Sequence, residues 1–153
     1  MNDIVTKINI ENMIYEVRGK QVMLDSDVAY LFGYETKQIN RQVMRNITRF
    51  PENYCFRLNE DEYKNLRCQS VTSSVSGYGS RRYLPYVFTE YGITMLAGIL
   101  KSEVAVKMSL KIVNTFISMR KYISNTLLEQ RYINNMVLEH ENEIKLLQQY
   151  LKN

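Results

Sequence analysis

The sequence predicts an α+β fold: a small antiparallel sheet or hairpin, a helix-turn-helix-like unit with packed helices, and a long C-terminal helix. Three observations predict it. Apolar residues flank a glycine at position 19, two helical stretches with start and stop signals follow it closely, and a heptad-like apolar repeat runs through residues 116–151. We expect one domain over residues 1–122 and a helical coiled-coil tail over 123–153.

The hairpin is expected over residues 13–24, where apolar residues lie on both sides of a turn containing Gly19. Asp25 or Ser26 can then cap a short helix, because their side-chain oxygens accept from the free N–H groups of a first helical turn. Gly33 is expected to end that helix.

A second helix is expected from Thr36 to Arg49, where Phe50–Pro51 ends it, because the residue before a proline is driven out of the helical region. Two helices joined by a tight turn form the helix-turn-helix plan. The alternation in residues 53–58 then predicts a strand.

Capping residues, Ser/Gly-rich stretches and proline predict the remaining helices, loop and strand. Asn59 and the acids after it predict a helix start, and the Ser/Gly-rich residues 69–80 predict a loop. Residues 83–88 resemble a strand, which Pro85 would favour at an edge of the sheet. Thr89 and Ser102 can cap two further helices, the second of them long.

Composition permits a polyanionic partner. The 153 residues carry a formal net charge of +4, with a sequence pI near 9.0 and 45% apolar residues, which excludes wholesale disorder. The basic charge is local, because four of the seven Lys and Arg in residues 1–50 lie between Lys37 and Arg49.

Other features favour a reducing compartment. Cys55 and Cys68 are too few and too far apart for a disulfide framework or a zinc site, the N-terminus lacks the pattern of a signal peptide, and no apolar run could span a bilayer. We therefore expect a cytoplasmic protein without a membrane contact, metal or cofactor.

The second expected helix has two unlike faces. At 100° per residue, Ile39, Val43 and Ile47 share one side, and the cationic and amide side chains share the other. Arg can donate two hydrogen bonds to guanine, amides can pair with adenine, and further cations can neutralise phosphates. The candidate DNA-binding residues are Thr36, Lys37, Gln38, Arg41, Gln42, Arg45, Asn46 and Arg49.

Two other interpretations of the basic residues stay open. The helix face could simply be solvated, as most charged helix faces are, although it lacks the mixed-sign pairs of a typical surface helix. Arg81 and Arg82, at the end of the Ser/Gly-rich loop, could form a wing that touches DNA, or an ordinary hairpin with two solvated arginines.

Two blocks of sequence, RGKQVMLDSDVAYLFGYETKQINRQVMRNITRFPENYCFRL and RRYLPYVFTEYGITMLAGIL, resemble the phage DNA-binding domain related to KilA-N and Bro-N. This domain is often called the open-reading-frame-six N-terminal domain. The resemblance covers roughly residues 10–120 and implies a small α+β, non-catalytic DNA-binding domain of phage antirepressors and related regulators. Its matching positions are Asp25 to Arg49 and Arg81–Arg82. Many members continue into an effector domain, whereas here we expect only a helical tail.

The tail carries apolar residues at eight of eleven a and d positions between Phe116 and Leu151, which predicts a coiled-coil homodimer. Thr126, Gln130 and His140 interrupt this seam and could fix its register. A helix that packs on its own domain, or a larger bundle, is the alternative. The expected contact residues are Ile123, Ile133, Val137, Ile144, Leu147 and Leu151.

The leading hypothesis is therefore a sequence-specific, non-enzymatic binder of double-stranded DNA that acts as a dimer in transcription regulation or antirepression. A second hypothesis is a protein-interaction module whose coiled coil captures a host or phage regulator. A nuclease would need carboxylates such as Asp25, Asp27 and Glu35, but no metal-dependent spacing links them.

Overall fold

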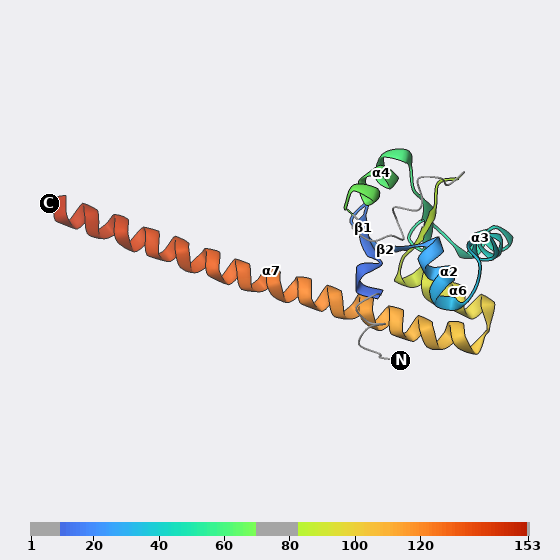
Figure 1. Cartoon of the computed structure of the whole chain (residues 1–153). Helices are drawn as coiled ribbons and strands as arrows, with labels where there is room; N and C mark the ends of the chain where they lie inside the picture. The colour runs from blue at the N-terminus through green and yellow to red at the C-terminus, as the bar shows by residue number, and fades with distance from the viewer. Residues whose placement is uncertain (1–9, 70–82, 153) are drawn as a thin grey trace. The chain divides into compact units, whose positions relative to one another are not determined.

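The computed structural model describes residues 10–69 and 83–152. The chain divides into two compact units, Met1–Phe116 and Ile117–Asn153. The first unit holds a four-stranded antiparallel sheet with several helices, and the second is the C-terminal part of a single long helix (Figure 1). The predicted α+β class is confirmed.

The elements follow one another along the chain in an order that interleaves helices and strands. They are β1 (Ile14–Val17), β2 (Lys20–Leu24), α2 (Asp25–Phe32), α3 (Thr36–Arg45), the 3-10 helix η1 (Ile47–Arg49), β3 (Cys55–Arg57), α4 (Glu60–Gln69), β4 (Tyr86–Phe88), α6 (Glu90–Leu100) and α7 (Glu103–Lys152).

The hairpin of β1 and β2 is present as predicted, with Val17 paired to Lys20 beside the turn. Both turn residues have positive φ, 55° at Arg18 and 72° at Gly19. This backbone is that of a type I′ turn, whose twist matches the twist of two antiparallel strands. The turn therefore fixes the register of the hairpin.

The strand order β1-β2-β4-β3 places β4 inside the sheet. The expectation that Pro85 would put this strand at an edge is therefore wrong. Pro85 lies one residue before β4, so its missing N–H is not needed for pairing, and its carbonyl accepts a hydrogen bond from the Leu58 N–H at 3.0 Å.

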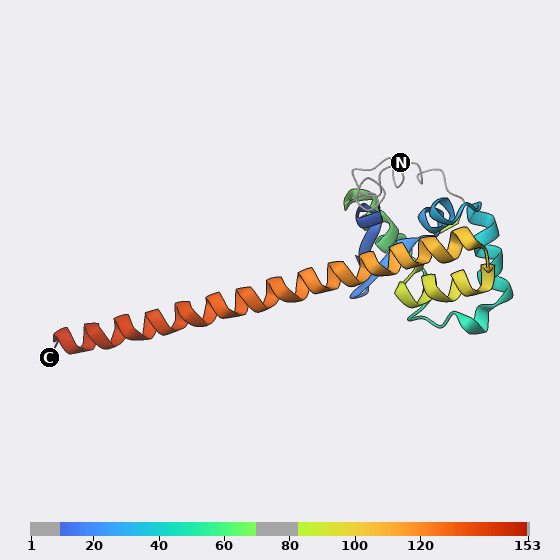
Figure 2. The ribbon, with the colours of Figure 1, turned by 90° about the horizontal axis from the view of Figure 1, so that it is seen from below.

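Helices cover both faces of the sheet. On one face, Val22, Leu24 and Val87 pack in a buried cluster with Tyr63 and Leu66 of α4. The alternate strand positions point the other way, toward α2 and α6, which contact β4 (Figures 1 and 2). The sheet is thus the centre of the first unit.

Gly33 ends α2 with a left-handed φ of 80°. Its N–H donates to the Tyr30 carbonyl at 3.3 Å, and the Tyr34 N–H donates to the Ala29 carbonyl at 2.9 Å. These two bonds form a Schellman motif, which satisfies carbonyls at the helix end and turns the chain sharply. Only Gly33 to Glu35 separate α2 from α3, and the two helices contact each other.

Three expected helix caps are confirmed. Each cap accepts a hydrogen bond from an N–H of the first helical turn, which would otherwise lack a partner. The pairs are Asn59 with Glu62, Thr89 with Gly92, and Ser102 with Ala105.

The start of α2 differs from the expectation. The residue in the N-cap position is Leu24, and the first helical residue is Asp25. The Asp25 carboxylate accepts from the Ser26 N–H at 2.7 Å and from the Tyr86 N–H at 3.1 Å. Asp25 therefore joins the start of α2 to β4.

Helix α7 takes part in both units. Its first turns bury Ala105, Ile112 and Phe116 in the first unit, whereas every described side chain from Arg120 onward is exposed. The expected coiled-coil seam therefore cannot begin at Phe116, because the core of the first unit already holds that ring. In the part of the chain that the structure describes, no helix is long and apolar enough to cross a membrane.

Candidate nucleic-acid interface

Two fully buried side chains, Ile39 and Val43, anchor α3 to the first unit. They lie four residues apart, so they form one apolar stripe, as the sequence predicts. The opposite side of the helix exposes Lys37, Arg41 and Arg45. Helix α3 lies at the periphery of the first unit in both views (Figures 1 and 2).

The basic face keeps its positive charge. Lys37 Nζ lies 3.3 Å from Glu35 Oε2, but both side chains are largely exposed, and an ion pair of this kind contributes little. Within residues 10–69 and 83–152, Arg41 and Arg45 have no ion pair. The guanidinium groups are thus available for phosphates or base edges.

The neutral candidates on α3 differ from one another in accessibility. Gln38 is exposed, and its Oε1 accepts the Glu35 N–H at 2.9 Å, which stabilises the first turn. Thr36, Gln42 and Asn46 are half-buried. The Asn46 amide donates to the Gln42 carbonyl at 2.9 Å, so it serves the helix end.

The expected helix to Arg49 is too long. Helix α3 ends at Arg45, because Asn46 leaves the helical region with φ −123°. The 100° spacing fails beyond this point, and Ile47, expected in the core, is 53% exposed. Phe50 is buried instead, and its ring meets the Phe88 ring edge-on at a centroid distance of 6.2 Å.

Arg49 lies in η1, outside α3. It borders a hollow of about 450 Å³ together with Thr94 of α6 and with Tyr54 and Tyr91, whose stacked rings have centroids 5.5 Å apart. The 100° spacing predicts Arg49 on the α3 face only if one continuous helix reaches it, and the break at Asn46 rules this out. In the structure Arg49 lines this hollow.

The suggested wing at Arg81 and Arg82 lies outside the residues that the structure describes. Its role in DNA contact stays a prediction. The strand that follows it, β4, leads into the centre of the sheet.

Three residues that the sequence analysis does not single out lie beside the basic face: Met44, Arg57 and Tyr86. Met44 is 61% exposed on α3, and its Sδ accepts a hydrogen bond from the Tyr86 hydroxyl at 3.4 Å. The Arg57 guanidinium lies 4.4 Å from the centroid of the Tyr86 ring. The sequence does not show that these residues are neighbours, because the pairing of β3 with β4 brings Arg57 to Tyr86 and a separate side-chain contact brings Tyr86 to α3.

The carboxylates of α2 are buried. Asp25 is inaccessible and Asp27 is 3% exposed. Burial, reinforced by the negative charge of Asp25, raises the pKa of Asp27 to about 7. In the described ranges, no cluster of three or more His, Cys, Asp or Glu residues is arranged to hold a metal ion.

The cysteine of β3 is also buried. Burial raises the pKa of the Cys55 thiol to about 12, with a further contribution from the charge of Asp25, while Arg57 lowers it. Cys55 and Cys68 are both free thiols, the second of them exposed.

Comparison with models of protein families matches residues 12–99 to the ORF6N domain, which is more than half of the chain. The chain belongs to the ORF6N family. The match runs from β1 into α6, so the basic face of α3 lies inside the ORF6N domain. ORF6N membership confirms the resemblance found in the sequence and is consistent with regulation of the phage type. Searches of curated proteins and of solved structures gave no match.

Proposed function

We propose that this ORF6N protein is a sequence-specific, non-enzymatic binder of double-stranded DNA that acts as a cytoplasmic transcription regulator or antirepressor. The observation that carries the proposal is the basic face of α3. Arg41 and Arg45 are exposed without an ion pair in the described structure, on a helix whose reverse side is anchored by buried Ile39 and Val43.

In this proposal α2 and α3 act as a helix-turn-helix unit. Helix α3 enters the major groove, where Arg41 and Arg45 donate to guanine edges or phosphates. The hydrogen-bonded Schellman turn at Gly33 supports this role, because a recognition helix has to be held at a fixed angle to the helix before it.

Substitution of both arginines tests the proposal. A duplex is first selected from a random pool with the 153-residue chain. The affinities of the wild type and of Arg41→Ala/Arg45→Ala for this duplex are then compared at fixed salt. We expect a loss of about 1–3 kcal/mol for each bidentate base contact, and a smaller loss on a scrambled duplex.

The matched control removes the same charge elsewhere. Lys64 and Arg67 are exposed on α4, which lies away from α3 in both views of the first unit (Figures 1 and 2). Lys64→Ala/Arg67→Ala should keep its preference for the selected duplex. Equal affinities of the wild type and the α3 variant, with unchanged circular dichroism, would contradict the proposal.

The proposal includes a homodimer formed by the tail. The six expected seam residues are between 47% and 83% exposed in the single chain, so pairing would remove a large apolar surface from water. A dimer presents two α3 helices, and the spacing of the selected half-sites would report their separation.

The second candidate function is capture of a regulator protein by the tail. Apolar side chains outside the seam favour it, since Leu128, Leu138 and Leu146 are each more than half exposed. In that case Leu138→Glu/Leu146→Glu should abolish binding to the regulator and leave self-association of the chain intact. Loss of binding only with seam substitutions would argue for a partner that needs the dimer.

A further inference from the structure

We propose that Arg57 of β3 is an additional DNA contact, which binds a backbone phosphate beside α3. The inference rests on the proposed function and extends its surface from the helix to the sheet. Its physical basis is the contact of this guanidinium with the Tyr86 ring of β4, whose hydroxyl in turn contacts Met44 of α3.

The position of Arg57 follows from the pairing of β3 with β4. Cys55 and Phe56 are buried, whereas Arg57 is exposed at the end of β3 and lies directly opposite Tyr86. Its guanidinium lies over the Tyr86 ring at 4.4 Å. This cation–π contact restricts the long side chain, so binding a phosphate there costs less conformational entropy than binding one to a free arginine.

Tyr86 connects Arg57 to α3. Its hydroxyl donates to Met44 Sδ at 3.4 Å, and Met44 lies seven residues after Lys37 and three after Arg41. Residues at these spacings share one face of a helix. Arg57 therefore lies on the flank of the basic face, where the sugar-phosphate backbone passes when a helix occupies the major groove.

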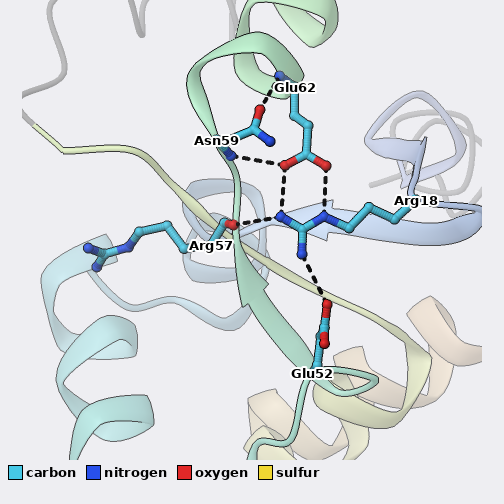
Figure 3. Close-up of polar contacts among 5 residues, drawn as sticks. All are labelled: Arg18, Glu52, Arg57, Asn59 and Glu62. Atoms are coloured by element: carbon cyan, nitrogen blue, oxygen red, sulfur yellow. Dashed lines mark hydrogen bonds and ion pairs between the residues drawn. The ribbon is translucent and has the colours of Figure 1, made fainter.

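The backbone of Arg57 is held from the opposite side. Its carbonyl accepts a hydrogen bond from Arg18 at 3.4 Å, and its side chain extends away from Arg18 (Figure 3). The two arginines have different roles, because Arg18 is neutralised by Glu52 and Glu62, whereas Arg57 has no ion pair in the described part of the chain. A positive charge that is held in place and lacks a counterion suits a phosphate.

The test measures the affinity of the 153-residue chain for its selected duplex as a function of salt concentration. Arg57→Ala should weaken binding about tenfold at low salt. It should also make the negative slope of log Kobs against log[salt] shallower by about one. The loss should be equal on selected and scrambled duplexes, because phosphates carry no sequence information. Arg57→Lys should retain the slope and part of the affinity.

Arg67→Ala is the matched control, because Arg67 is also exposed and lies over a tyrosine ring, that of Tyr63 in α4. It should leave affinity and slope unchanged. If Arg57→Ala kept the wild-type slope while Arg41→Ala/Arg45→Ala lost binding, only the role of Arg57 would be overturned, and the proposed function would stand. If none of these variants changed binding, the proposed function itself would fail. Thermal unfolding of each variant separates these outcomes from loss of the fold.

Discussion

Arg18 Nε lies 2.7 Å from Glu62 Oε2 and joins the β1–β2 turn to α4. The same glutamate accepts the Asn59 N–H at 2.9 Å, so one carboxylate serves both an ion pair and a helix cap. Arg18 also contacts Glu52 (Figure 3). Its guanidinium carbon lies 4.3 Å from the centroid of the Phe56 ring. A residue with positive φ thereby ties the hairpin to the far side of the sheet.

Glu62→Gln should lower the free energy of unfolding by about 1 kcal/mol. Glutamine can still accept the Asn59 N–H, so the change isolates the charge opposite Arg18. The Arg18 hydrogen bond lowers the pKa of Glu62, so this contribution is present above the ordinary carboxyl pKa and is lost as the pH falls through the folded pKa. Chemical denaturation at pH 7 and pH 3 measures both effects.

Glu60→Gln is the control for the Glu62 variant, since Glu60 is an exposed first-turn acid of the same helix. Its effect should be a few tenths of a kcal/mol, from the helix dipole alone. Equal losses in the two variants would mean that the ion pair contributes nothing.

Asp27→Asn should make the stability of the fold less dependent on pH. Burial raises the pKa of Asp27 from 3.8 to about 7, so between these values the folded protein keeps a proton that the unfolded chain releases. Wild-type stability therefore falls as the pH rises from about 4 to 7, by up to a few kcal/mol. The variant should be the more stable protein at pH 8, with a smaller advantage at pH 4.

Urea denaturation across this pH range tests the effect of Asp27. Glu141→Gln is the control, because Glu141 is exposed and its substitution should leave the pH profile unchanged. A stability difference between Asp27→Asn and wild type that stayed constant from pH 4 to pH 8 would exclude the titration of Asp27 as its cause.

Val137→Glu/Ile144→Glu should convert the proposed dimer to a monomer, since charges in a coiled-coil seam cannot be buried without a partner. Light scattering coupled to gel filtration measures the mass. Leu138→Glu/Leu146→Glu is the matched control, with single-chain exposures of 57% and 65% against 50% and 55% for the seam pair. A monomer from the control pair and a dimer from the seam pair would contradict the predicted seam.

Local patterns allowed correct prediction where the deciding contact is local. The hairpin with its turn at Gly19, the Gly33 stop and the Asn59, Thr89 and Ser102 caps each depend on hydrogen bonds or φ angles within a few residues. The buried stripe of Ile39 and Val43 also follows from helical spacing alone.

Predictions from the sequence were wrong where the position of a residue depends on a distant contact or on a break in the helical periodicity. Asn46 ends the helical phase, so Ile47 is exposed and Phe50 takes the core position beside Phe88. Likewise, β4 lies inside the sheet because β2 and β3 both pair with it. The place of Arg57 over the Tyr86 ring depends on the pairing of β3 with β4.

Gly92→Ala should destabilise the first unit by about 1–3 kcal/mol, because a β-carbon at this position would overlap the Tyr54 carbonyl oxygen. That carbonyl cannot easily move, since it accepts the Thr89 N–H at 3.0 Å. Gly98→Ala in the same helix meets nothing within 4 Å and should stabilise by up to about 1 kcal/mol. Thermal unfolding measures the change in stability of both variants. Changes of opposite sign would show that Gly92 is needed for close packing, and changes of the same sign would show that helix propensity alone governs α6.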